Sequence, residues 1–190
     1  CQAVESTWAR KSSPQSRRLA RRAIKLIVPS LKDYVLTGSK SSARKMAKGS
    51  NLSGRAINIS QTTACHALSY KLTSDFSVPH GNAVGLTIGA FMDFLSSEAP
   101  RLEGLAAKLL VQSLASLRVQ LGFRPSEPAV NEFRELLRNL GLFETLRAAG
   151  VNESSDVAHL AESVDPNRLG NSPILLSRSD LVKILEASWD

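Results

Sequence analysis

The sequence is poor in the residues that mark several large classes of protein. It has two cysteines, Cys1 and Cys65, which are too few for a disulfide framework and are typical of a chain kept in a reducing compartment. Its most apolar stretch, residues 83–94, is shorter than the roughly 18 to 20 uncharged residues that a membrane span needs. The first residues show no apolar secretory leader. We therefore expect a cytoplasmic protein that has no membrane partner.

Length and composition predict one domain with a substantial core. Of the 190 residues, 43% are hydrophobic and 5% are aromatic, which are the proportions of an ordinary globular chain. The chain has no initiator methionine and begins at once on a helix-like pattern. We expect residues 1–190 to form a single helical domain that is truncated at its N-terminal edge.

The net charge of +7 comes from one short stretch. Residues 10–25 hold seven basic side chains and no acid, so the rest of the chain is neutral. Leu19, Ala23, Ile24 and Ile27 recur at helical spacing on the opposite side, which indicates an amphipathic helix with a solvated basic face. The alternative is contact with a phosphate-bearing ligand, an acidic partner or nucleic acid. Because no aromatic residues are interleaved and no nucleic-acid motif is present, we expect no nucleic-acid partner.

Helical periodicity runs through almost the whole sequence, and no stretch sustains the period of two that marks a strand. Ser12 and Gln15 around Pro14 predict a helix start with Ser12 as the cap, and Gly38 suits the stop. A turn-rich break is expected at residues 49–54, after a short polar helix or loop. The predicted helices cover about 14–36, 55–73, 80–97, 100–121 and 127–140, with shorter ones at 143–149, 154–162 and 180–189. The predicted fold class is all-α, an irregular helical bundle.

Two of the three histidines bracket the connection between the two most apolar helices. His66 lies in the central helix and His80 begins the next one, so that a helix, a turn and a second helix can bring the rings together. Neutral imidazole is a good ligand for iron or zinc, and burying two such rings is easier when a cation satisfies them. Core packing or helix capping is the alternative for such a pair taken alone.

The segment around these histidines resembles the signature of the iron-containing (group III) alcohol dehydrogenases. In that family a histidine ligand on one helix is followed fourteen positions later by Pro-His-Gly and an apolar helix, as His66 and Pro79-His80-Gly81 are here. The opening Gln2-Ala3-Val4-Glu5-Ser6-Thr7-Trp8 is similar to the family's ligand helix. By that alignment an Asp ligand lies four positions before Gln2, outside the chain, and Gln2 stands where many members have a histidine.

The resemblance implies a fold, a cofactor set and an activity. It implies the helical C-terminal domain shared with dehydroquinate synthase-like proteins, in which His66 and His80 bind a divalent metal, iron or zinc. Gln2 stands at a ligand position, but its neutral amide is a poorer ligand than imidazole. No glycine-rich phosphate loop occurs, so NAD or NADP is expected to bind a nucleotide-binding domain absent from these residues. The implied oxidoreductase transfers hydride with the metal polarising the substrate oxygen, the fragment alone is expected to be inactive, and a homodimer stays open as the assembly.

Other residues near this signature have less specific interpretations. Tyr70 stands where many relatives carry a further histidine near the substrate, so the resemblance gives it substrate contact, with packing as an equal alternative. Cys65 points about 100 degrees away from His66 around the helix and is expected in the core. His159 is expected at the surface. The turn at residues 167–173, Asn-Arg-Leu-Gly-Asn-Ser-Pro, is similar to one in a subset of the family linked to phosphonate metabolism, which implies a small alcohol or aldehyde substrate, phosphonate-bearing in that subset.

Two functions of other classes remain open from the sequence. The first is a nonredox lyase similar to dehydroquinate synthase, which shares the metal role and acts on a cyclic phosphate substrate. The second is a helical binding module whose basic helix contacts nucleic acid, with the histidines purely structural. Aldehyde-dependent oxidation of NADH separates the first from a dehydrogenase, and a steep loss of nucleic-acid affinity with salt identifies the second.

Overall fold

The computed structural model describes all 190 residues and consists of helices and their connections, without a strand. This confirms the predicted all-α class. The helices are α1 (Gln2–Trp8), α2 (Pro14–Thr37), α3 (Lys40–Ser60), α4 (Ala64–Phe76), α5 (His80–Glu98), a 3-10 helix (Ala99–Arg101), α6 (Gly104–Leu121), α7 (Ala129–Asn139), α8 (Ser154–Glu162), α9 (Pro166–Leu169) and α10 (Arg178–Ala187). None of them combines the length and the apolar content that crossing a bilayer requires.

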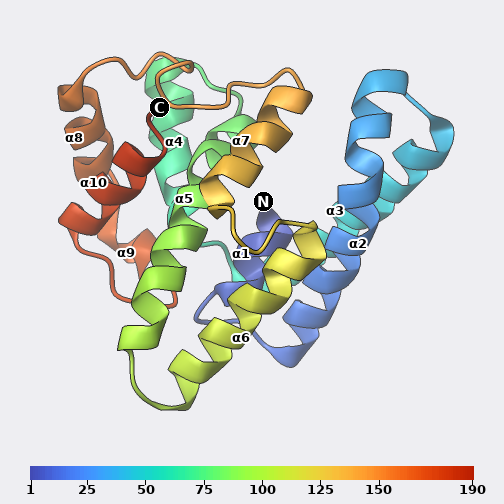
Figure 1. Ribbon diagram of the computed structural model, residues 1–190, viewed down its shortest axis with the longest axis horizontal. Coiled ribbons are helices and arrows are strands. Elements are labelled where there is room, and N and C mark those ends of the chain that lie inside the picture. The colour runs from blue at the N-terminus through green and yellow to red at the C-terminus, as the bar shows by residue number, and fades with distance from the viewer.

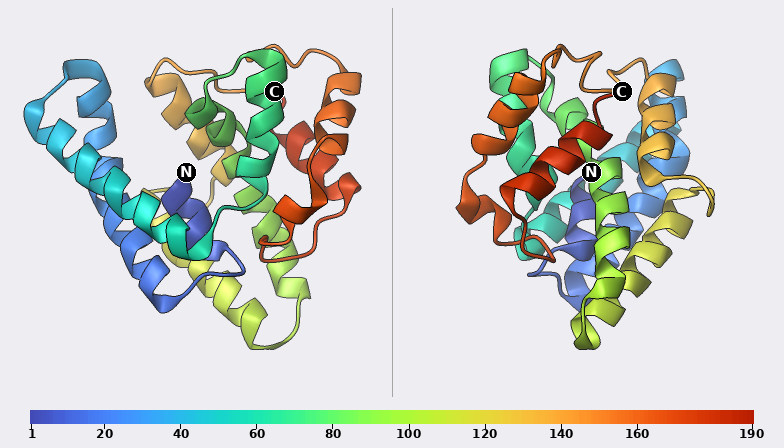
Figure 2. Two further views of the ribbon diagram at one scale, coloured as in Figure 1. Left: turned by 180° about the vertical axis from the view of Figure 1, so that it is seen from behind. Right: turned by 60° about the vertical axis from the view of Figure 1, so that its left-hand side comes forward.

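The helices form a body and a projecting arm. The arm is the antiparallel pair α2 and α3, whose tip stands apart from the other helices in Figure 1 and again from behind in Figure 2. At the base of the arm, α1 packs on both α2 and α3. In the body, α5 packs on α4, α7 and α10, and α8 packs on α4 and α10. The chain therefore starts between the arm and the body (Figure 2).

Two apolar cores hold this arrangement together. The first joins α1, α2, α5 and α6, and in it the rings of Trp8 and Phe91 meet edge to face with centroids 5.6 Å apart. The second joins α4, α8 and α10 around the fully buried Leu68, Leu72 and Leu160. Helix α5 supplies residues to both cores. Because apolar burial is the dominant stabilising term, α5 fixes α1 relative to α4, and these two helices carry the candidate site.

The predicted break at residues 49–54 is wrong, because α3 runs through it without interruption. A Cβ at Gly49 would lie 2.6 Å from Cγ1 of Ile27, so this glycine permits the close approach of α3 to α2. That packing outweighs the cost of about 1 kcal/mol that glycine imposes inside a helix. The real break lies at residues 61–63, which contain neither glycine nor proline. His66 consequently lies in the first turn of a helix and not in the middle of one.

The cap of α2 lies one residue later than predicted. Ser13 Oγ accepts a hydrogen bond from the Ser16 amide at 3.1 Å, and Ser16 Oγ accepts one from the Ser13 amide at 2.9 Å. This reciprocal pair satisfies two amides that the helix leaves free, which is the function that the sequence suggested for Ser12 and Gln15. The rest of the prediction for this helix holds, since α2 ends at Gly38 in the left-handed conformation.

The short helix predicted at residues 143–149 is absent, and turns replace it. The amides of Leu146 and Arg147 donate to the carbonyls of Ser188 and Trp189, at 3.0 and 3.1 Å. These amides therefore satisfy the C-terminal end of α10 instead of continuing a helix of their own. A long-range pairing of this kind overrides local helix propensity and leaves no periodic trace in the sequence.

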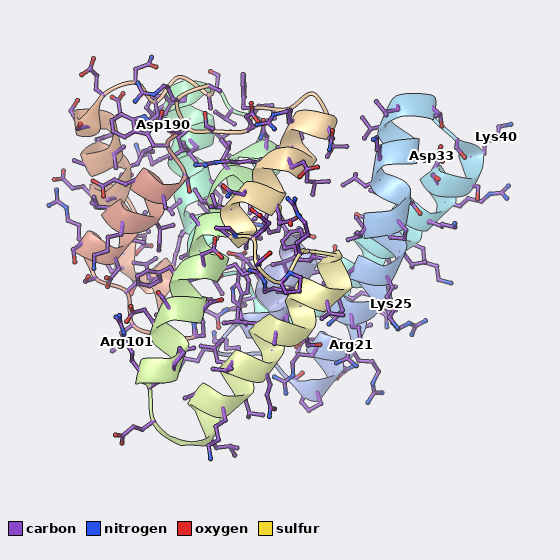
Figure 3. The ribbon with its side chains drawn as sticks, viewed as in Figure 1. Arg21, Lys25, Asp33, Lys40, Arg101 and Asp190 are labelled. Atoms are coloured by element: carbon purple, nitrogen blue, oxygen red, sulfur yellow. The ribbon has the colours of Figure 1, made fainter.

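The basic stretch forms the amphipathic helix that its periodicity predicts. Leu19, Ala23 and Ile24 of α2 are buried, while Arg22 and Lys25 are exposed. Figure 3 shows Lys25 directed away from the body. No basic side chain between residues 10 and 25 forms an ion pair within the chain. The face is therefore a solvated one in this structure.

Candidate metal centre

The site is organised by a buried carboxylate from the first helix. Glu5 lies on α1 among apolar neighbours and is fully buried. Its Oε1 accepts hydrogen bonds from the hydroxyl of Thr63 at 2.6 Å and from the amide of Cys65 at 3.0 Å. Thr63 precedes α4 but does not cap it with its own side chain. Glu5 therefore caps the N-terminus of α4 from another helix, where the helix dipole also favours a negative charge.

The second oxygen of Glu5 fixes the orientation of His66. Glu5 Oε2 contacts Nδ1 of His66, and both side chains are buried. Burial alone would raise the pKa of Glu5, but the hydrogen bond and the charge interaction with His66, together with the Thr63 bond, outweigh burial and lower the pKa. An ionised carboxylate only accepts, so Nδ1 of His66 carries the proton. In the neutral ring, Nε2 is then the nitrogen that carries the free electron pair.

A serine does the same for the other imidazole. Ser69 Oγ donates its single proton to the His66 carbonyl at 2.7 Å. In its 3.2 Å contact with Nδ1 of His80, Ser69 Oγ must therefore accept, and Nδ1 carries the proton. His80 is the first residue of α5, and Nε2 is again the nitrogen with a free electron pair. Each histidine thus has a partner that selects the same tautomer.

The structure brings the two rings together. Their centroids are 5.4 Å apart, with an angle of 66° between the ring planes. Two neutral imidazoles with free Nε2 atoms and hydrogen-bonded Nδ1 atoms are a donor set that fits iron or zinc, and the carboxylate behind His66 is the usual support of such a ligand. No third histidine, cysteine or carboxylate joins them. Residues 1–190 thus offer two donors of this type to a cation.

Gln2 is engaged elsewhere. Its Oε1 accepts a hydrogen bond from the hydroxyl of Ser53 on α3 at 3.1 Å. No hydrogen bond links Gln2 to His66 or His80. The structure therefore brings together two of the three residues at which the sequence suggested a ligand, while the third faces the arm.

Tyr70 lies beside the imidazole pair and not in the core. Its side chain is about half exposed, with a relative accessibility of 49%, and its ring centroid lies 6.0 Å from that of His80. The guanidinium carbon of Arg168 lies 4.5 Å from the centre of the tyrosine ring. Core packing, the alternative that the sequence left open for Tyr70, is therefore not its environment.

The Cys65 thiol and the third histidine, His159, lie outside the site. Cys65 is fully buried in the first core, where burial and then the nearby Glu5 charge raise the pKa of its thiol well above the ordinary value. His159 is exposed on α8, and its Nε2 lies 3.1 Å from a carboxylate oxygen of Asp75. Both fit the structural roles expected of them.

Sequence reasoning gave no role to the residues that support the histidines. Glu5 is the one acid of α1, in a helix whose other buried members include Ala3, Val4 and Trp8. A lone carboxylate in so apolar a segment is a signal that it has a buried partner. Ser69 gives no comparable signal, because serines are frequent in this sequence.

Comparison with known proteins adds a family to this geometry. The family model described as "Fe-containing alcohol dehydrogenase family, C-terminal" matches residues 1–189. A phosphonoacetaldehyde reductase from Streptomyces viridochromogenes is 30% identical, over 97% of this chain and 46% of its own length. Long-chain-alcohol dehydrogenase 1 from Geobacillus thermodenitrificans is 31% identical, over 98% of this chain and 47% of its own. The chain therefore spans about half the length of the curated relatives it matches.

Solved structures agree at the level of the fold. An alcohol dehydrogenase from Oenococcus oeni superposes with a TM-score of 0.82 at 22% sequence identity. The match covers 99% of this chain and 49% of that one. The arrangement of helices described above is thus also found in a larger protein, as about half of its chain.

Proposed function

The chain belongs to the iron-containing alcohol dehydrogenase family, and we propose that the protein containing it transfers hydride between a nicotinamide cofactor and a small alcohol or aldehyde. The observation that carries the proposal is the pair His66 and His80, with rings 5.4 Å apart and both Nδ1 atoms engaged. Two imidazoles held in this way are better suited to bind a cation than to pack in an apolar core. The Streptomyces relative is named for phosphonoacetaldehyde, which supports an aldehyde substrate that includes phosphonate-bearing members.

The residues of this chain have distinct parts in the proposed site. His66 and His80 hold a divalent cation, iron or zinc, together with donors from outside residues 1–190. A cation so held supplies Lewis-acid polarisation of the substrate oxygen. Glu5 and Ser69 keep both Nε2 atoms unprotonated, and Tyr70 forms a wall against which the substrate lies. Gln2 is left out of the proposed ligand set, because its side chain contacts Ser53 of α3 and a neutral amide is a poorer ligand than imidazole.

The nucleotide cofactor belongs elsewhere in the proposed protein. Dinucleotide-binding folds are built on a parallel sheet with a phosphate loop between a strand and a helix, and residues 1–190 contain no strand. The relatives are about twice as long as this chain. We propose that NAD or NADP binds a separate domain and that the substrate reacts between the two, so that residues 1–190 alone are inactive.

The test uses the full-length protein. Oxidation of NADH or NADPH should depend on an added aldehyde, and metal analysis should find about one divalent ion per chain. Changing both His66 and His80 to Ala should remove that ion and lower kcat/KM by about a thousandfold or more, the effect of losing several kcal/mol of electrostatic stabilisation. The matched control is His159→Ala, which removes a surface imidazole of the same chain.

Two results would contradict the proposal. Full metal content after the double substitution would show that the imidazole pair does not hold the ion. Metal-dependent turnover of a cyclic phosphate without any aldehyde-dependent oxidation of the cofactor would identify the lyase class instead.

A further inference from the structure

A polar pocket lies next to Tyr70, between the connection of α3 to α4 and the short helix α9. It has a volume of about 310 Å³, at the lower end of the range for ligand pockets, which suits a small substrate. Hydroxyl, amide and phenol groups line it, with Arg168 as its one charged residue and no carboxylate. The pocket is therefore electropositive and rich in groups that bind oxygen atoms.

Arg168 differs from most of the arginines elsewhere in the body. Arg147 and Arg178, for example, are paired with carboxylates, whereas Arg168 has no ion partner and only stacks on Tyr70. The neighbouring acid, Asp165, caps α9 with one oxygen, which accepts the Asn167 amide at 2.9 Å, and it forms no ion pair with Arg168. An exposed guanidinium with five donors, held against a ring and without a counter-ion, is suited to bind an oxyanion.

A second cation reinforces the field at the rim of the pocket. Lys11 Nζ donates to the side-chain oxygen of Gln61 at 2.7 Å, and Gln61 lines the pocket. Lys11 forms no ion pair within the chain. Lys11, through Gln61, and Arg168 therefore both bring a positive charge to a neutral polar lining, an arrangement that attracts an anion.

The pocket wall is held in one conformation. Gln61 has φ 59° and ψ 177°, a region that is almost confined to glycine and costs another residue about 1–3 kcal/mol. The side-chain amide of Asn171 donates to the backbone carbonyls of the two residues that flank Gln61, Ser60 at 2.8 Å and Thr62 at 2.9 Å. Asn171 itself is buried and belongs to the turn that follows Arg168. The turn that carries the guanidinium is thus fastened to the loop that leads into the histidine helix.

Tyr70 connects this pocket to the imidazole pair. Its ring lies 4.5 Å from the Arg168 guanidinium carbon and 6.0 Å from the His80 ring. Arg168 and His80 therefore lie against the same tyrosine ring, and a small molecule bound to Arg168 can extend past that ring toward the imidazole pair.

We propose that Arg168 binds the oxyanion at the far end of a small aldehyde, a phosphonate, sulfonate or carboxylate group, and so selects substrates that carry one. The redox step at the other end of that molecule rests on the function proposed above. The anion subsite itself rests on the pocket, on the absence of a counter-ion and on the fixed turn.

Steady-state kinetics of the full-length protein test this selection. The measured quantity is kcat/KM for phosphonoacetaldehyde, sulfoacetaldehyde and succinic semialdehyde, each divided by kcat/KM for the neutral propionaldehyde. Arg168→Gln should lower the ratio for the preferred anion by about 10- to 100-fold, mainly through KM, because a charge-assisted bidentate contact is lost. Arg168→Lys, which keeps the charge but loses the two-pronged guanidinium contact, should give a ratio between those of the parent protein and Arg168→Gln.

The control is Arg22→Gln, a change to an exposed arginine of α2 with no partner, which should leave the ratio as it is. Equal ratios in the parent protein and in Arg168→Gln would overturn the subsite.

A binding measurement keeps this inference separate from the proposed function. Methylphosphonate, methanesulfonate and acetate are titrated into the full-length protein without nucleotide, and binding is followed by calorimetry. We expect saturable binding of one of these anions that Arg168→Gln weakens at least tenfold and that the His66, His80 double substitution retains. Such binding in a protein without redox activity would uphold the subsite and refute the dehydrogenase. Redox activity without Arg168-dependent anion binding would do the reverse.

Discussion

The junction of α1, α4 and α5 and the exposed face of α2 hold their polar groups in opposite ways. At the junction, Glu5 is fully buried, and each of its oxygens has a hydrogen-bond partner from α4 or the residue before it. On α2, Arg18, Arg22 and Lys25 are exposed and form no ion pair. The first region has a single acid, and the second has most of the net charge.

This difference teaches which polar residues carry structural information. A buried charge without partners costs several kcal/mol, so the positions of the groups around Glu5 are fixed by necessity. An exposed charge costs almost nothing, so the basic face of α2 does not fix the positions of neighbouring groups and does not by itself indicate a function. A substitution in each region measures the contrast, and we expect its effect to fall steeply from the junction to the arm.

The largest effect is expected from substitutions of Glu5. Glu5→Ala leaves the buried donors of Thr63, Cys65 and His66 without an acceptor and should destabilise the protein by about 3–5 kcal/mol. Glu5→Gln keeps the shape, but its amide places an N–H group toward Nδ1 of His66. That nitrogen then has to accept, which moves the ring proton to Nε2 and removes the free electron pair. We expect metal affinity to fall by about 10- to 100-fold.

The tautomer of His66 can be observed directly. Nitrogen NMR of the metal-free protein should show Nδ1 protonated in the parent and Nε2 protonated in Glu5→Gln. Glu5→Asp, which remains an acceptor, is the matched control and should restore part of the affinity. An unchanged tautomer in Glu5→Gln would show that the carboxylate supports the fold without directing the histidine.

These supporting contacts also mark the limit of the sequence. The fourteen-residue spacing of His66 and His80 predicted their neighbourhood, because an apolar helix on each side of a short loop leaves few arrangements. The break before α4 was missed, since Gln61 is held there by Asn171, 110 positions away, and not by a local glycine or proline. Arg168 was noted only as part of a turn motif. Contacts between distant segments determine these features, and periodicity reports only on segments taken singly.

Replacing a glycine by alanine should change stability in opposite directions in the body and in the arm. A Cβ at Gly89 of α5 would lie 2.7 Å from the Val130 Cα and 2.9 Å from the Ala129 carbonyl oxygen, both rigid backbone atoms. Gly89→Ala should therefore destabilise by about 1–3 kcal/mol through overpacking. Gly54, inside α3, has open space around the same position, and Gly54→Ala should stabilise by about 0.5–1 kcal/mol. Urea midpoints of the two variants check this, and a raised midpoint in Gly89→Ala would contradict the close packing at Gly89.

Low pH should separate the stability of the parent protein from that of Glu5→Gln, because Glu5 is ionised in its buried pair with His66. The pKa of Glu5 is lowered from its ordinary value of 4.5, so its contribution to stability is fully present above that pH and is lost as pH falls through the lower folded value. The parent protein should therefore lose more stability below pH 4.5 than Glu5→Gln, which has no proton to bind. Urea midpoints of both proteins from neutral pH downward measure the difference. Parallel curves would mean that Glu5 is not ionised in the folded state.

The smallest effect is expected on α2, and its sign is informative. Arg18 and Arg22 are four residues apart on one exposed face, where like charges destabilise a helix by about 0.2–0.5 kcal/mol. Arg22→Gln should therefore stabilise α2 slightly, and salt should abolish the gain because it screens exposed charges. Hydrogen exchange of the α2 amides at low and at high salt resolves so small a change. A loss of protection above about 1 kcal/mol in the full-length protein, insensitive to salt, would show that this arginine has a buried partner there. The basic face would then resemble the junction after all, and its charge would carry structural information.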